Sequence, residues 1–233
     1  MPVSRQFRSC LARNLRESQY IKEVTKIVST ILNDRNVLEI ICFGLGQISC
    51  CNISRHQLAF LLCLKEFCKP KKVLVHDPIF YRDECEVLKN FSLEIIQQNS
   101  EGSYAISDEC ITLVYLPHCP KQLTNNFLWS NWGEKLKNCI IICNSFNSII
   151  ENHPSRILLE TIPYLYKIHP YTLEKVLENN FKYTDIFNDT SLHYFPKEKL
   201  ESVPVEFWNK GEKPVYENTE EFITSLMIEK LNI

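Results

Sequence analysis

The apolar positions of the chain alternate between helical spacing and short continuous runs. Over residues 17–34 they recur at helical spacing, which predicts an amphipathic helix. Residues 37–43 then form an almost continuous apolar run that ends at Gly44. A run of this kind is typical of a strand that is covered on both faces, as in a parallel sheet.

The same alternation continues to residue 143. The further predicted elements are a helix with Ser54 as its N-cap that ends before Pro70, a strand at 72–76, a helix at 82–90, strands at 93–96 and 111–116, a helix at 122–132 and a strand at 139–143. Strands that alternate with helices form βαβ units around a parallel sheet. We therefore predict an α/β fold of the Rossmann-like type, with a mostly parallel open sheet flanked by helices.

The pattern changes after Pro154. It predicts helices at 157–166 and 171–180, a hairpin over 183–195 with its turn at Asn188 and Asp189, a strand at 203–208 and a final helix at 218–231. No linker separates this region, so we expect an antiparallel C-terminal hairpin added to the same sheet. The predicted organisation is a flexible basic segment at 1–16 and a single domain at 17–233.

Composition narrows the class of protein. The 233 residues are 45% hydrophobic and 23% charged with a net charge of −2, as in an ordinary globular domain. This balance gives no reason to expect a nucleic-acid or membrane partner. The 11 cysteines contain no pair at the CxxC spacing of a zinc site. We interpret most of them as buried thiols in a reducing compartment, which predicts the cytoplasm, with the nucleus as a second location.

The fold rule for open α/β sheets indicates where a site should lie. Ligands bind beyond the carboxyl ends of the strands, near the point at which the strand order reverses. The segments that follow predicted strands are residues 44–49, 77–80, 117–120 and 144–146. These four segments are therefore the candidate site.

The first segment is a near-match to the GxGxxG pattern. Two of the chain's 5 glycines, Gly44 and Gly46, stand here, and Ser49 takes the last place. Glycines let backbone N–H groups approach an anion, and the N-terminus of the next helix favours negative charge. Asp77, which follows the second strand, could accept hydrogen bonds from a ribose. The alternatives are a tight turn without a ligand and a carboxylate that caps a loop.

The segment 117–120 holds His118 and Cys119 between two prolines. Imidazole and thiolate are both good iron ligands, so one hypothesis is metal or haem ligation by Cys119. A second is a Cys nucleophile, although adjacent side chains point in opposite directions and leave His118 poorly placed as its base. The third is a rigid turn with a packed thiol.

Further polar side chains could line a binding site. Asn125 and Trp129 are four residues apart on one helical face, and Asn126 stands beside them. A carboxamide beside an indole can bind a planar ligand, but it can equally pack on the core. Asn144 and Ser145 supply polar groups after the fifth strand, with the same two interpretations.

Five motifs occur together and in a fixed order. They are Cys42–Ser49, His76–Phe80, Tyr115–Pro120, Asn125–Trp132 and Asn144–Phe146. In this order they resemble the Sensitivity to Red light Reduced (SRR-like) family, over a motif core at 38–150 that leaves 151–233 as a C-terminal elaboration. The resemblance implies roles in circadian clock regulation and, as in animal members, in haem and the control of haem biosynthesis. It implies no established reaction.

Two functional hypotheses follow. The first is a regulatory protein that acts through haem, another small ligand or a regulatory protein partner, with Cys119, alone or together with His118, as the haem ligand. The second is a transferase that uses adenosylmethionine or a nucleotide on the Gly44–Ser49 loop, with Asp77 at the ribose. A protein-interaction module without a ligand is a third interpretation. No complete acid–base pair or metal site is visible in the sequence, and the oligomeric state stays open.

Overall fold

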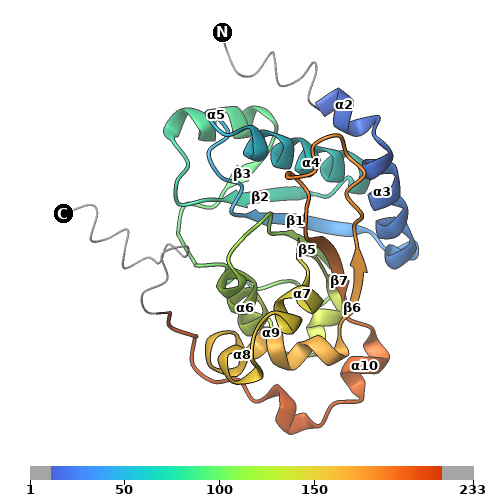
Figure 1. The fold of residues 1–233 in the computed structure, drawn as a ribbon, viewed down its shortest axis with the longest axis vertical. Coiled ribbons are helices and arrows are strands. Elements are labelled where there is room, and N and C mark those ends of the chain that lie inside the picture. Colours follow the sequence, from blue (N-terminus) through green and yellow to red (C-terminus); the bar gives the residue numbers. More distant parts are fainter. Residues whose placement is uncertain (1–11, 217–233) are drawn as a thin grey trace, which may run out of the picture.

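The computed structural model describes residues 12–216 (Figure 1). The predicted helix at 218–231 lies outside the described residues, as does most of the basic N-terminal segment.

One seven-stranded sheet forms the centre of the fold, with the order β3-β2-β1-β4-β5-β7-β6. The strands are β1 (Val37–Phe43), β2 (Lys72–His76), β3 (Glu94–Ile95), β4 (Ile111–Tyr115), β5 (Cys139–Asn144), β6 (Leu173–Val176) and β7 (Thr190–Tyr194). The first five are paired in parallel, whereas β7 is antiparallel to both β5 and β6. The predicted fold class is therefore confirmed, including the antiparallel C-terminal part.

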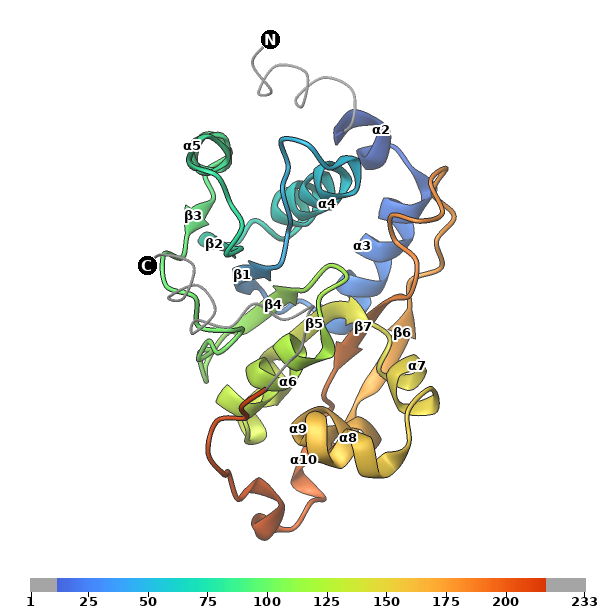
Figure 2. The ribbon, with the colours of Figure 1, turned by 60° about the vertical axis from the view of Figure 1, so that its left-hand side comes forward.

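Helices cover both faces of the sheet (Figure 2). On one side lie α2 (Ala12–Arg16), α3 (Gln19–Leu32), α4 (Asn52–Cys68) and α5 (Arg82–Asn90), and on the other α6 (Lys121–Ser130), α7 (Phe146–Glu151), α8 (Ser155–Thr161) and α9 (Pro163–Ile168). Successive residues of β1 serve the two cores in turn: Ile40 packs with the first group of helices and Ile41 with the second. Burial on both faces explains the continuous apolar run in the sequence.

Short helices complete the chain. They are η2 (Glu134–Asn138), η3 (His169–Tyr171), α10 (Lys197–Glu201) and η4 (Val205–Trp208). None of the helices within residues 12–216 combines the length and the hydropathy that crossing a bilayer requires.

The predicted N-cap of α4 is wrong. The helix begins at Asn52 with Cys51 at the N-cap position, three residues before Ser54. The Cys51 N–H already donates to the Gln47 carbonyl at 3.0 Å, so the chain is turning before Ser54. Ser54 is instead buried against Gly46.

The helix predicted at 171–180 is also wrong. Leu173 and Val176 have helical spacing, but they belong to β6 at the edge of the sheet. Pairing with β7 outweighs the local pattern, and Val176 remains 62% exposed at the edge.

The hairpin predicted over 183–195 has the wrong first strand. β7 pairs with β6, and residues 177–189 form a long connection between them. The apolar residues of that connection pack in the core, where Phe187 stacks on Tyr20 at a ring distance of 4.7 Å. They had the composition of a strand because they are buried.

The strand predicted at 203–208 is a 3-10 turn, η4. Its aromatic residues pack on the far end of α6, where Phe207 stacks on Trp132 with ring centroids 5.0 Å apart. Aromatic content therefore reflected packing rather than strand pairing.

The carboxyl ends of the parallel strands meet at one edge of the sheet. The strand order reverses between β1 and β4, since β2 follows on one side of β1 and β4 lies on the other. Gly44, Asp77, Pro117 and Ser145 come directly after or within two residues of β1, β2, β4 and β5. This edge is where a doubly wound sheet binds its ligands.

Candidate functional site

The glycine loop after β1 requires glycine at two positions. Gly44 and Gly46 have φ angles of +73° and +76°, in the left-handed region that side chains disfavour. A Cβ on Gly46 would lie 2.5 Å from the Ser54 Oγ, and one on Gly44 would overlap the Cys119 Sγ. The loop is therefore closely packed against both α4 and the segment after β4.

Asp77 ties this loop to the end of β2. Its Oδ2 accepts the Gly46 N–H at 2.7 Å and its Oδ1 accepts the Ile79 N–H at 3.1 Å. Burial raises the pKa of this carboxyl, and the two N–H donors oppose that rise. The side chain thus has the capping role that was the alternative to a ribose contact, and the ribose contact stays a prediction.

Glu84, which the sequence analysis did not single out, holds the other end of the same loop. It is buried near the start of α5, and its Oε1 accepts the Ser49 N–H at 2.7 Å. Its Oε2 accepts the Tyr81 N–H at 2.9 Å, as in a capping box. The available signal was a glutamate at the third position after Tyr81, but nothing local connects Glu84 to Ser49.

His118 and Cys119 face different partners. The His118 ring Nε2 lies 2.8 Å from the Ile186 carbonyl, and the residue has a φ of +48°. The Cys119 thiol is buried and donates to the Phe43 carbonyl at 3.2 Å. Burial raises the pKa of Cys119 strongly, and the nearby Asp77 charge adds to this. The sulfur is therefore held as a neutral thiol.

Two cavities lie at this edge. One of about 160 Å³ lies between Gly44 and the segment 117–120, and one of about 580 Å³ extends beyond β2 and β3; Gly46 and Ser49 line neither. The smaller is lined by Phe43, Gly44, His76, Asp77, Pro78, Asn99, His118, Cys119, Pro120 and Leu123. The larger shares His76, Asp77, Pro78 and Asn99 with it, so the two lie next to each other at the end of β2.

His76, the last residue of β2, has a buried nitrogen without a partner. The side chain is 7% exposed and borders both cavities. Its Nδ1 lies 2.8 Å from the Ile96 carbonyl, so Nδ1 carries a proton, and in the neutral ring Nε2 is an acceptor. Among residues 12–216 nothing donates to that Nε2. In the sequence, His76 stood out only as the first residue of the motif His76–Phe80.

The carboxamide and indole candidates lie elsewhere. The Asn125 Oδ1 accepts the backbone N–H groups at the start of α9, from Tyr164 at 2.9 Å and Leu165 at 3.1 Å. The Asn126 Nδ2 donates to the Glu101 carbonyl at 2.9 Å. Neither residue lines the two cavities.

Trp129 and the two asparagines also bind the end of the described chain. The Trp129 Nε1 donates to the Gly211 carbonyl at 3.0 Å, and the Asn125 Nδ2 donates to the Tyr216 hydroxyl at 2.8 Å. The Tyr216 hydroxyl in turn donates to the Asn126 Oδ1 at 3.0 Å. In this arrangement the motif fixes residues 211–216 on α6.

Asn144 and Ser145 belong to different parts of the edge. The Asn144 Nδ2 donates to the Cys119 carbonyl at 3.3 Å, which places it beside the smaller cavity. Ser145 is the N-cap of α7, and its hydroxyl donates to the Glu174 Oε1 at 2.5 Å.

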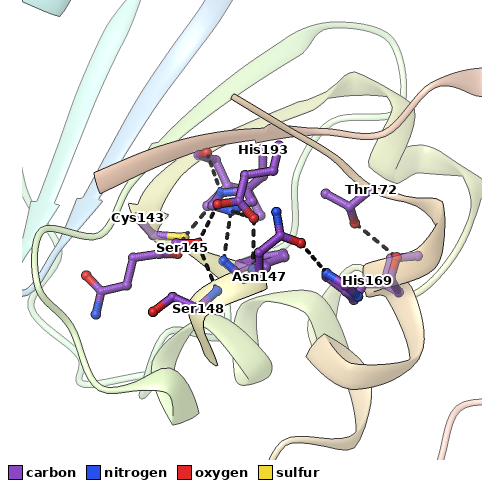
Figure 3. Close-up of polar contacts among 12 residues, drawn as sticks. Cys143, Ser145, Asn147, Ser148, His169, Thr172 and His193 are labelled. Atoms are coloured by element: carbon purple, nitrogen blue, oxygen red, sulfur yellow. Dashed lines mark hydrogen bonds and ion pairs between the residues drawn. The ribbon is translucent and has the colours of Figure 1, made fainter. Parts of the chain in front are cut away.

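Ser145 is part of a second polar cluster, at the junction of β5, β6 and β7 (Figure 3). His193 is fully buried, with its Nε2 3.5 Å from the Glu174 Oε2, and the Asn147 N–H donates to the same oxygen at 2.9 Å. Burial alone would raise the pKa of Glu174, but hydrogen bonds from His193, Ser145 and Asn147 outweigh it and lower the pKa to about 2. The cluster joins the C-terminal strands to α7.

No metal site is apparent at either place. Within residues 12–216, no group of three or more His, Cys, Asp or Glu side chains is arranged to hold a metal ion.

The fold and the cavities define a class: a doubly wound α/β domain with a ligand-sized hollow at the reversal of its strand order. The SRR1 domain family matches residues 17–194. The chain belongs to the SRR1 domain family, as its five motifs predicted.

Three proteins whose names refer to this family are similar to the chain. An SRR1-like protein of Drosophila melanogaster is 35% identical over 193 residues, which are 79% of this chain and 65% of that protein. An SRR1-like protein of Mus musculus is 38% identical over 131 residues, 55% of this chain and 52% of that one. The protein SENSITIVITY TO RED LIGHT REDUCED 1 of Arabidopsis thaliana is 25% identical over 179 residues, 74% and 64% of the two chains.

The chain thus spans between 52% and 65% of the length of the curated relatives it matches. No solved structure matches the chain.

Replacing Gly46 tests the loop. We expect Gly46→Ala to lower the free energy of unfolding by about 1–3 kcal/mol, because a positive φ and the Ser54 contact both disfavour a Cβ. Gly211→Ala is the control, since its Cβ would meet only the Tyr164 hydroxyl at 3.6 Å, and we expect a change within about 0.5 kcal/mol. Urea unfolding measures both, and equal losses would contradict the described loop.

The lowered pKa of Glu174 predicts a pH-dependent contribution to stability. A carboxyl whose pKa falls on folding stabilises the protein above its unfolded pKa, and this is lost as the pH falls from about 4.5 toward 2. We expect Glu174→Gln to cost about 1–3 kcal/mol at pH 7, with the difference shrinking toward pH 2. The exposed Glu178→Gln is the control for urea unfolding across this range. A loss at pH 7 that is unchanged near pH 2 would show that the charge is not responsible.

Proposed function

We propose that this SRR1-domain chain is a regulatory protein that binds a small ligand in the two cavities beyond β1, β2 and β4. The observation that carries the proposal is the His76 Nε2, a buried acceptor that borders both cavities and has no donor among residues 12–216. A buried acceptor left unpaired costs about 1–3 kcal/mol, which a ligand with a donor group would recover.

The regulated processes are circadian clock regulation and the control of haem biosynthesis, as the family resemblance implies, in the cytoplasm and the nucleus. The name of the plant relative, which refers to reduced sensitivity to red light, supports a role in responses to light. A regulatory protein partner would bind differently to the ligand-bound and the ligand-free protein.

A regulatory role is also supported by how the reactive side chains are used. The Cys119 thiol donates to a carbonyl, and the His118 ring contacts the Ile186 carbonyl instead of that thiol. A nucleophile needs a base within hydrogen-bond reach, and this pair has no such contact.

Haem ligation by Cys119 is the finer prediction of the resemblance, and the surroundings of the sulfur do not fit it. A thiolate binds iron, whereas burial raises the pKa of Cys119 and its thiol donates to the Phe43 carbonyl. The adjoining cavity of about 160 Å³ is smaller than a porphyrin. Ligation at Cys119 would require the segment 117–120 to move.

A second candidate function is a transferase that uses an adenosine-containing cofactor. The strand order supports it, because an antiparallel β7 between β5 and β6 is also the arrangement of adenosylmethionine-dependent methyltransferases. Gly44 and Asp77 stand at the positions that such folds use for the cofactor.

A ligand screen read by nuclear magnetic resonance tests the proposed function. The chain has 5 glycines, so the amide signals of Gly44 and Gly46 are easily followed. We expect at least one compound of a metabolite panel to raise the melting temperature and to shift these two signals, because binding to the folded state stabilises it. Stabilising compounds that leave both signals unchanged would contradict a site at this edge.

Titration with ferric haem tests whether Cys119 is a haem ligand. The geometry predicts that Cys119→Ala gives the same Soret spectrum as the unaltered chain, because the thiol is held away from iron chemistry. Cys139→Ala, another buried thiol with a raised pKa, is the matched control. A Soret change confined to Cys119→Ala would establish haem ligation at Cys119 and overturn the geometric argument.

A further inference from the structure

Two of the backbone N–H groups that could bind a phosphate in this fold, those of Gly46 and Ser49, are already occupied. In dinucleotide-binding sheets, the N–H groups of the glycine loop point at the pyrophosphate. Here the Gly46 N–H donates to the Asp77 Oδ2 and the Ser49 N–H donates to the Glu84 Oε1, both at 2.7 Å. A phosphate would have to displace two buried carboxylates.

The charge of the residues that line the cavities also disfavours a phosphate. Asp77 is the acidic group among the described residues that line them, and none of those residues is a lysine or an arginine. Glu84, a second carboxylate, lies against the loop from the side of α5. An anionic ligand would meet like charge without a compensating cation, which costs affinity.

The larger cavity has a mixed lining of apolar side chains and polar groups. Its apolar lining comes from Pro78, Phe80, Cys85, Ile95 and Ile96, and its carboxamides from Gln97, Gln98 and Asn99. A volume of about 580 Å³ lies within the usual range of ligand pockets. A nucleobase has apolar faces and polar edges, so its faces can pack on the apolar side chains while its edge meets the carboxamides.

Two acceptors remain for donors of the ligand. The His76 Nε2 lacks a donor among residues 12–216 and borders both cavities. Each Asp77 oxygen accepts one backbone N–H, and a carboxylate oxygen has capacity for a further donor. An amino group and ribose hydroxyls supply such donors.

We propose that these cavities bind an adenine nucleoside that carries no phosphate. The base lies in the larger cavity, its amino group donates to the His76 Nε2, and the ribose lies beside Asp77. This inference rests on the proposed function, whose ligand it names by class. Free adenosine and thioether or sulfonium derivatives of adenosine share this chemistry.

Calorimetric titration of the full chain tests the class of ligand. Its arms are adenosine, S-adenosylhomocysteine and adenosine monophosphate. We expect adenosine, S-adenosylhomocysteine or both to bind, and the monophosphate to bind at least about tenfold more weakly than the better of the two. Binding of S-adenosylhomocysteine alone would assign the thioether derivative as the source. Equal or tighter binding of the monophosphate would overturn the proposal.

Variants test the roles of the named residues. In His76→Asn the side-chain amide can still donate to the Ile96 carbonyl, but the Nε2 acceptor is lost, so we expect at least about a tenfold weaker affinity. His153→Asn is the control, because His153 also contacts a carbonyl through Nδ1 and lies outside both cavities. Glu84→Gln keeps an oxygen for the Ser49 N–H without the charge, and should reduce the discrimination against the monophosphate.

The amide signals of Gly44 and Gly46 distinguish failure of the nucleoside assignment from failure of the proposed function. This measurement uses the unaltered chain, so it does not depend on whether a variant folds. If no adenosine compound shifts Gly44 and Gly46 but another class of compound does, the nucleoside assignment is wrong and the proposed function stands. If no compound shifts them, both fail. Full affinity in a folded His76→Asn would also overturn the assigned contact.

Discussion

The carboxylate of Asp77 is the contact on which the arrangement of the sheet's carboxyl edge depends. It joins the glycine loop after β1 to the turn after β2 through the Gly46 and Ile79 N–H groups. Glu84 repeats the same device at Ser49, so both ends of the loop are held by buried carboxylates. In a loop that resembles a phosphate-binding sequence, two of the N–H donors are thereby satisfied within the protein. The kind of ligand that this edge can bind depends on these two carboxylates, because they take the place of a phosphate at the loop.

The family motifs divide into two structural roles. The runs after β1, β2 and β4 surround the cavities, where Gly44, Asp77 and Cys119 are in one lining. The asparagine- and tryptophan-rich run on α6 has a different role, because Asn125 binds the start of α9 and Trp129 binds Gly211. This motif of the family therefore has a structural role: it attaches the C-terminal region to α6.

Most of the fold could be predicted as far as β5, because burial on both faces gives each strand a local signature. The C-terminal region could not, since β6 has helical spacing and becomes a strand only by pairing with β7. The positions of the site were predictable from the strand ends, but its contacts were not. Glu84 meets Ser49 across 35 residues, and the partner of His76, Ile96, lies 20 residues away. Such long-range pairs leave no periodic trace in a single sequence.

Amide hydrogen exchange at Gly46 and Ser49 tests the central claim most directly, because it reports whether the loop donors are occupied by Asp77 and Glu84. We expect the amides of Gly46 and Ser49 to exchange far more slowly than the amides of an unstructured chain. We also expect the Gly46 amide proton shift to titrate with a midpoint above the ordinary pKa of an aspartate, since burial raises the pKa of Asp77. Exchange of both amides at the rate of an unstructured chain would show that the donors are free to bind an anion, and would contradict the account.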